Sequence, residues 1–92
     1  MSYEKRRPKY DIYADIIEAI SKKGSCTLTR VSYGANMPGD RTKKEVRFLI
    51  SLGFVTEAVV DASKKYKVTK WGLEYLETCK QMRKSFAALD EK

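Results

Sequence analysis

In the middle of this 92-residue chain, a group of cations directly precedes an apolar stretch. In "PGDRTKKEVRFLISLGFV", residues 38–55, charged and polar residues come first and an apolar ladder follows. A helix of this kind can pack through its apolar face and present its first turns to a polyanion. We expect Val46, Leu49 and Ile50 to face the core. The residues expected on or beside the outward face are Arg41, Thr42, Lys43, Lys44 and Arg47.

Catalytic and metal-binding chemistry find little support in the composition. The chain has no His, which excludes a Cys/His zinc site and a Cys–His nucleophile. Its two cysteines, Cys26 and Cys79, lack C-x-x-C spacing, and neither a P-loop nor GxGxxG is present. General acid–base work at neutral pH would need a perturbed carboxylate, Lys or Cys. We therefore predict no enzyme activity, no metal site and no cofactor.

The charge balance narrows the class of partner. Nineteen Lys and Arg against twelve Asp and Glu give a formal charge of +7, which favours nucleic acid or an anionic membrane surface, unless the excess serves only solubility. No apolar run is long enough to cross a bilayer and no signal-peptide hydrophobic region follows the N-terminus, so we expect a cytoplasmic protein without a membrane partner. The length and the 42% apolar share predict one folded domain.

Three helices are predicted before and within the cationic stretch. An apolar stripe of isoleucines indicates a first helix in residues 11–24. A short second helix is expected after Thr27, which suits an N-cap, with a tight turn at Gly34 and Asn36. The third helix should run from about Pro38 to Leu52. Two short helices joined by a Gly-containing turn predict a helix-turn-helix, in which the N-terminal part of the second helix enters the DNA major groove.

A β-hairpin is predicted next, from about residue 54 to 69. The segment alternates and is rich in Val, Thr, Tyr and Phe, with turn-prone Asp61, Ala62 and Ser63 at its middle. Lys64 and Lys65 would lie at its tip. A cationic hairpin after a helix-turn-helix is a wing, which contacts the phosphate backbone or the minor groove. Alternatively, these lysines only protect an exposed strand edge from pairing with other chains.

The N-terminal residues 1–9, "MSYEKRRPK", carry cations without a core pattern. We expect a flexible basic arm in which Arg6 and Arg7 contact phosphates or a minor groove. A disordered solubilising tail is the alternative.

The last predicted element is a long helix that Thr69 caps, over about residues 70–89. Apolar residues recur along it at spacings of 4, 3, 4 and 3, which is the pattern of a heptad seam. We expect this seam to form a homodimer interface, the alternative being that it packs within its own domain. Its members are Tyr75, Cys79, Met82, Phe86 and Leu89. The expected organisation is therefore an arm (1–9), a DNA-binding domain (10–69) and a dimerisation helix (70–92).

Three segments carry a resemblance to a known family. "VSYGANMP" at 31–38, "VRFLISLGFV" at 46–55 and "YKVTKWGLEYLE" at 66–77 resemble the small archaeal and archaeal-virus winged-helix proteins, within the broad MarR-like and PadR-like group. The resemblance implies an α+β winged helix-turn-helix with a three-helix core, a hairpin wing and a long C-terminal dimerisation helix. It also implies binding of double-stranded DNA as a homodimer. Since the group includes hyperthermophilic archaea, an intersubunit disulfide through Cys79, or from Cys26 to Cys79 of a second copy, is a further expectation.

Three functions remain open at this level. The leading hypothesis is a transcriptional regulator in which Arg41, Thr42 or Lys44 reads base edges, while Lys43, the wing and the arm contact phosphates. The second is an architectural DNA-binding protein with little sequence preference. The third is a protein-interaction module in which the charge is incidental. No site for a small-molecule effector is predicted.

Overall fold

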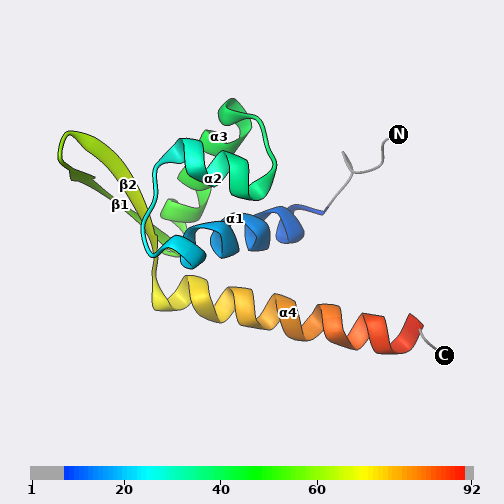
Figure 1. Ribbon diagram of the computed structural model, residues 1–92. Helices are drawn as coiled ribbons and strands as arrows, with labels where there is room; N and C mark the ends of the chain where they lie inside the picture. The colour runs from blue at the N-terminus through cyan, green and yellow to red at the C-terminus, as the bar shows by residue number, and fades with distance from the viewer. Residues whose placement is uncertain (1–7, 91–92) are drawn as a thin grey trace.

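The computed structural model describes residues 8–90 and confirms the predicted winged helix-turn-helix order of three helices, a hairpin and a long last helix (Figure 1). Arg6 and Arg7 of the predicted arm lie outside the described residues. No helix in the described part of the chain is long and apolar enough to cross a membrane. The elements are α1 (Lys9–Lys23), α2 (Leu28–Ala35), α3 (Gly39–Ser51), β1 (Val55–Val60), β2 (Ser63–Val68) and α4 (Lys70–Asp90).

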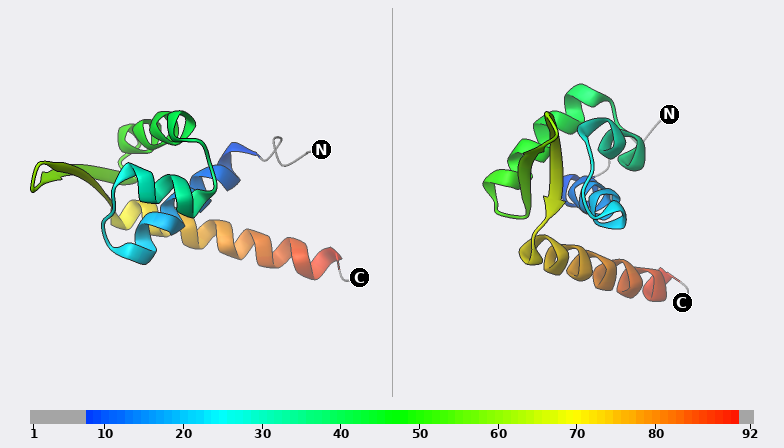
Figure 2. Two further views of the ribbon diagram at one scale, coloured as in Figure 1. Left: turned by 45° about the horizontal axis from the view of Figure 1, so that its top comes forward. Right: turned by 60° about the vertical axis from the view of Figure 1, so that its left-hand side comes forward.

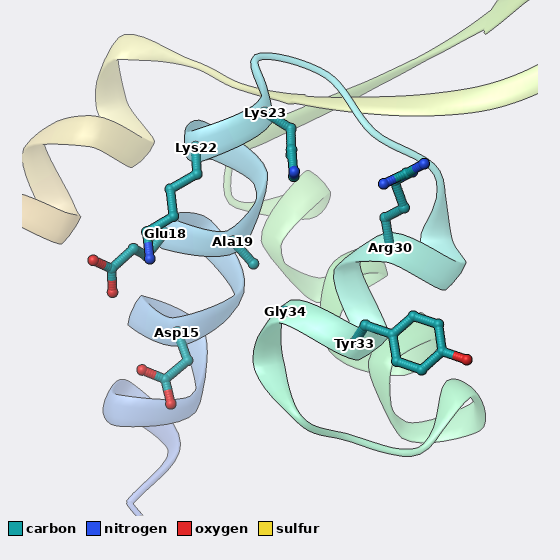
Figure 3. Close-up of a pocket in the computed structure, with 8 residues that line it drawn as sticks. All are labelled: Asp15, Glu18, Ala19, Lys22, Lys23, Arg30, Tyr33 and Gly34. Atoms are coloured by element: carbon teal, nitrogen blue, oxygen red, sulfur yellow. The ribbon is translucent and has the colours of Figure 1, made fainter.

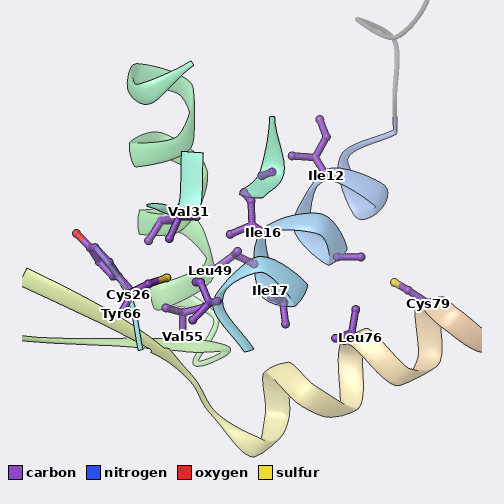
Figure 4. Close-up of a cluster of buried hydrophobic side chains, with 14 residues drawn as sticks. Ile12, Ile16, Ile17, Cys26, Val31, Leu49, Val55, Tyr66, Leu76 and Cys79 are labelled. Atoms are coloured by element: carbon purple, nitrogen blue, oxygen red, sulfur yellow. The ribbon is translucent and has the colours of Figure 1, made fainter. Parts of the chain in front are cut away.

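The core is organised around α1, which lies between α4 on one side and α2 with α3 on the other (Figures 1 and 2). The predicted isoleucine stripe is buried along the whole helix: Ile12, Ile16, Ile17 and Ile20 are at most 4% exposed. Figure 4 shows the side chains that meet this stripe, with Val31 and Leu49 on one side and Leu76 and Cys79 of α4 on the other. The first half of α4 therefore belongs to the same core as the three helices.

Close contact between α1 and α2 explains one glycine. Gly34 lies inside α2, not in the turn after it as predicted, and a Cβ there would come 2.7 Å from Cβ of Ala19. The turn begins at Asn36, the residue directly after the helix, which adopts a left-handed conformation with φ 56°. Thr27 caps the start of α2 as predicted, because its side-chain oxygen accepts a hydrogen bond from Arg30 N.

The hairpin joins β1 and β2 in antiparallel register from Val55 opposite Val68 to Val60 opposite Ser63. Its turn consists of two residues, Asp61 and Ala62, with φ of 51° and 65°, so Ser63 already belongs to β2. The φ values suit the tight turns that follow the twist of a hairpin. Cys26 adds a short bridge on the free edge of β2 through two backbone hydrogen bonds to Tyr66.

A compact junction attaches α4 to the hairpin. The Thr69 hydroxyl donates to Gly53 O at 2.6 Å and accepts from Gly72 N at 3.2 Å, which confirms Thr69 as the cap. Gly72 approaches the backbone so closely that a Cβ would lie 2.3 Å from Phe54 O. The Thr-x-x-Gly sequence therefore combines a helix cap with a backbone contact that excludes a side chain.

Charged contacts fix α4 along α1. Arg83 forms an ion pair with Asp11 and lies 3.6 Å from a carboxylate oxygen of Asp15, while Lys80 Nζ lies 3.9 Å from Glu18. The burial of Leu76 and Cys79 sets the direction in which α4 leaves the domain, and these partly exposed pairs add to it. Beyond them the helix continues past the three-helix core (Figure 1).

Candidate nucleic-acid interface

The outward side of α3 carries a row of exposed cations, which we call the α3 cationic face: Arg41, Lys43, Lys44 and Arg47. The helix starts where Pro38 is extended, and it is anchored by Val46 and Leu49, which are each 1% exposed. Residues at i, i+3, i+4 and i+7 share one side of a helix, so the buried pair turns the cations toward solvent. Ile50 is only partly buried and packs at the margin of the core.

Thr42 is not part of this face, and the prediction that it reads base edges is wrong. The residue is fully buried, and its hydroxyl donates to Pro38 O at 2.8 Å. Thr42, Val46 and Leu49 follow one another at spacings of 4 and 3, which places all three on the core side. The bond to Pro38 satisfies the hydroxyl, so a polar residue can occupy a core position at the start of α3.

A buried carboxylate supports the cationic face from below. Glu45 is 3% exposed, and its Oε2 lies 3.0 Å from Lys9 Nζ of α1 and 3.8 Å from Arg41 Nε. A buried carboxylate is stable only with such partners, so Arg41 is drawn toward a fixed position at the N-terminal half of α3. Sequence reasoning missed this residue, although its spacing of four from both Arg41 and Leu49 indicated a pair on the core-facing side.

The wing presents its two predicted lysines on opposite faces, because successive side chains of a strand alternate. Lys64 is exposed on the same face as the buried Tyr66, and its Nζ lies 3.8 Å from Glu57 across the hairpin. Lys65 is half-buried on the other face. Of these two lysines, only Lys64 therefore shares a side with the α3 cationic face.

Tyr66 connects this side of the wing to α3. Burial raises the pKa of Tyr66, the charge of Glu57 raises it further, and the charge of Arg47 opposes the rise. The Arg47 guanidinium is therefore close enough to Tyr66 to interact with its hydroxyl electrostatically. Arg47 of α3 and Lys64 of the hairpin therefore lie toward the same side of the molecule, where Glu57 pairs with Lys64.

The predicted seam of α4 divides into two parts. Tyr75 donates its hydroxyl proton to Tyr10 O at 2.7 Å and stacks on Phe54, while Cys79 is 4% exposed within the core. Met82, Phe86 and Leu89 are exposed by 41%, 54% and 64%. The alternative of packing within the domain thus holds for the first two residues, and only the last three form an exposed stripe.

The predicted intersubunit disulfide through Cys79 finds no support in this packing. Both Cys26 and Cys79 are free and buried, and Cys79 lies between α4 and α1 (Figure 4). The 4-and-3 spacing identified the apolar side of α4, but it could not show that α1 covers the edge where Cys79 lies. A thiol in this position is not accessible to a second copy.

A shallow groove of about 390 Å³ separates α1 from α2, with Ala19 and Gly34 at its floor (Figure 3). Asp15 and Glu18 of its rim are held by Arg83 and Lys80. The remaining charged residues of the rim are Lys22, Lys23 and Arg30, and the last two extend toward the same space between the helices (Figure 3). Residues 8–90 contain no group of His, Cys, Asp and Glu side chains arranged to hold a metal ion.

Comparisons with known proteins agree with this architecture. A family model described as winged helix-turn-helix matches residues 6–86. Sso10a-2, a DNA-binding protein from Sulfolobus solfataricus, has a similar structure, with a TM-score of 0.76, 24% identity and coverage of 92% of this chain and 90% of that one. TubR of Bacillus thuringiensis, solved bound to 24 bp of tubC, gives a TM-score of 0.68 and 23% identity over 85% and 88% of the two chains.

A MarR family transcriptional regulator from Silicibacter pomeroyi is also similar, with a TM-score of 0.75 and 16% identity. The alignment covers 92% of this chain but 57% of that protein, so the chain spans little more than half of this regulator. No curated protein sequence matches. At these identities the likeness to solved structures establishes the fold.

Proposed function

This chain belongs to the winged helix-turn-helix family, and we propose that it is a dimeric transcriptional regulator that binds double-stranded DNA in the cytoplasm. In this proposal α3 enters the major groove, as the second helix of a helix-turn-helix does. The wing lies along the adjacent phosphate backbone or in the minor groove. Two structurally similar proteins support DNA as the partner, since one is described as DNA-binding and another was solved with DNA bound.

The observation that carries the proposal is that exposed cations of α3 and Lys64 of the wing lie toward the same side of the molecule. Lys43, Lys44 and Arg47 are exposed on one side of a helix that is anchored by its other side, and Lys64 extends this side along the hairpin. Positive charge spread along an exposed helix and a hairpin fits a duplex backbone better than it fits a small ligand. Lys43 and Lys64 would contact phosphates, and Arg41 and Lys44 would reach base edges, with Arg41 suited to guanine N7 and O6.

Dimerisation would follow from α4. The exposed stripe of Met82, Phe86 and Leu89 begins beside Arg83 and follows the part of α4 that continues past the core, where a second copy can reach it. Pairing two such helices about a two-fold axis would place two α3 helices toward half-sites about one DNA turn apart. In this arrangement residues 10–69 bind DNA and the C-terminal part of the 70–92 segment makes the dimer.

Selection of duplexes from a random pool tests the proposal, and we expect an enriched palindrome. Arg41→Ala or Lys44→Ala should then weaken binding to the selected site by about 1–3 kcal/mol and relax preference at one position of each half-site. Unchanged affinity and preference in both variants would contradict the role of α3. Equal affinity for selected and random duplexes would instead favour an architectural protein, and no binding at low salt would favour a protein-interaction module.

A further inference from the structure

A second cationic surface lies on the side of the wing that faces away from α3. A groove of about 530 Å³ runs between the end of α1, with the loop that follows it, and the hairpin, and we call it the outer wing groove. Lys23 lies at the end of α1, and Lys65 and Lys67 lie on the strand side. None of its lining residues is acidic, and the rest are small or apolar, so its charge is uniformly positive.

Strand alternation separates this groove from the α3 cationic face. Tyr66 points to the core side of the hairpin, where the charge of Arg47 acts on it, so Lys65 and Lys67 on either side of it point to the opposite face. A straight duplex lying on α3 and on Lys64 would therefore leave the outer wing groove empty. The proposed recognition of DNA does not use these lysines.

The positive charge of the groove is reinforced and not neutralised. Burial raises the pKa of the Cys26 thiol, and the charges of Arg30, Lys23 and Lys65 oppose that rise, so cations from three elements converge around one buried residue. In the part of the chain that the structure describes, none of these three cations takes part in an ion pair, and neither does Lys67. Gathering like charges without counter-charges costs stability, which a bound polyanion would recover.

We propose that the outer wing groove is a second binding site for the phosphate backbone of duplex DNA, outside the surface that reads the site. Lys65 and Lys67 lie two residues apart on one strand, about 6.7 Å along it, and Lys23 faces them from the end of α1. Charges spread along an open groove suit a chain of phosphates better than a single small anion. The phosphates come either from DNA that flanks the bound site on the same duplex or from a second duplex. This inference rests on DNA being the partner.

The test compares two variants of the full chain that carry the same net charge. Lys65→Gln with Lys67→Gln removes two groove cations, and Lys70→Gln with Lys84→Gln removes two exposed cations of α4. Binding is titrated with a duplex of about 20 base pairs, enough for two half-sites one turn apart, and with one of about 40. Each lost phosphate contact lowers the slope of log affinity against log salt by about 0.9. For each groove that contacts DNA, the two lost contacts should therefore reduce the fall in affinity between about 50 and 200 mM salt by about 12-fold. Thermal unfolding of each variant confirms that it is folded.

The two sources of phosphate give different results. For flanking DNA, the groove variant loses affinity and salt slope on the long duplex only. For a second duplex, the wild type binds a second equivalent of the short duplex and the groove variant does not. The proposal is overturned when the groove variant matches the wild type in salt slope and stoichiometry on both duplexes. It is also overturned when the α4 control loses as much affinity and salt slope as the groove variant.

A third variant separates this inference from the proposed function. Lys43→Gln with Lys44→Gln removes two charges from the α3 cationic face. Loss of binding in this variant, with no effect of the groove substitutions, overturns the groove alone. Loss in the groove variant with no effect at α3 overturns the proposed reading helix and keeps the groove. A wild type that binds neither duplex at low salt overturns both.

Discussion

Glu45 places a carboxylate beneath the α3 cationic face, within reach of both Lys9 and Arg41. Its effect on DNA binding would be indirect, because the carboxylate is buried and cannot touch DNA itself. By holding Arg41 through a contact of 3.8 Å, it restricts the directions in which that guanidinium can point. Glu45 is therefore a positioning residue for the base contact that we propose for Arg41.

Replacing Glu45 with Gln keeps the shape of the side chain and removes the charge. We expect Glu45→Gln to lower the binding free-energy preference for selected over random duplexes by about 1–3 kcal/mol, because Arg41 is no longer fixed. Binding to random duplexes should tighten slightly, since one negative charge is lost. Competition titrations with the two duplexes measure both effects.

Asp40→Asn is the matched control, because Asp40 is an exposed acid in the first turn of the same helix. It changes the net charge equally and leaves the Arg41 contact in place. The same change in affinity ratio for both variants would mean that Glu45 acts only through overall charge.

The sequence predicts the outward side of α3 well, but it does not predict every residue on it. The exposed positions of Arg41, Lys43, Lys44 and Arg47 agree with the prediction, because the apolar stripe of α3 defines the side opposite to them. The prediction fails at Thr42, whose polarity suggests an outward position while its spacing from Val46 indicates the core. A single internal hydrogen bond lets a polar residue occupy a core position, and its partner is known only once the backbone path is known.

The junction between the hairpin and α4 depends on one glycine. A Cβ on Gly72 would lie 2.3 Å from Phe54 O and 2.7 Å from Cγ1 of Val68. Alanine favours a helix by about 1 kcal/mol over glycine, but overpacking against a backbone atom costs about 1–3 kcal/mol or more. We therefore expect Gly72→Ala to lower the free energy of unfolding, measured by urea denaturation.

Gly39→Ala provides the comparison. Gly39 is the first residue of α3, and no atom lies within 4 Å of the position that its Cβ would take, so alanine there should be neutral or stabilising. Equal unfolding free energies for the two variants would show that the junction can relax without cost, and the close backbone approach would then not explain Gly72.

Elements were more predictable than their contacts. The helices and hairpin fall within a residue or two of the predicted ranges, because Thr27, Gly24 and Thr69 mark helix ends in ways that depend on local chemistry. Two predictions depend on distant parts of the chain: the turn at Gly34 was wrong, and the disulfide of Cys79 is not supported. Gly34 is required by Ala19 on another helix, and Cys79 is covered by α1. Neither neighbour can be identified from spacing along one element.

The last helix, α4, has two adjacent sides with different roles. Leu76, Cys79 and Arg83 face α1, and the exposed stripe of Met82, Phe86 and Leu89 lies about a quarter turn away around the helix. The buried Leu76 and Cys79 hold the first side in place without help from a second copy, and the ion pairs of Arg83 and Lys80 add a smaller contribution. A monomer should therefore stay folded while its stripe remains available for association.

This arrangement allows the proposed dimer to be tested without unfolding the domain. Phe86 is central in the stripe, and in a two-fold interface each substitution counts twice. Two Phe side chains at about 2 kcal/mol each contribute about 4 kcal/mol, so Phe86→Gln should raise the dimer dissociation constant roughly a thousandfold. Leu73→Gln is the control, because Leu73 is 48% exposed on the opposite side of α4. In sedimentation equilibrium at micromolar concentration we expect dimers for the wild type and Leu73→Gln, and monomers with an unchanged circular dichroism spectrum for Phe86→Gln. A monomeric wild type, or equal dimerisation of the two variants, would show that this stripe does not join two copies.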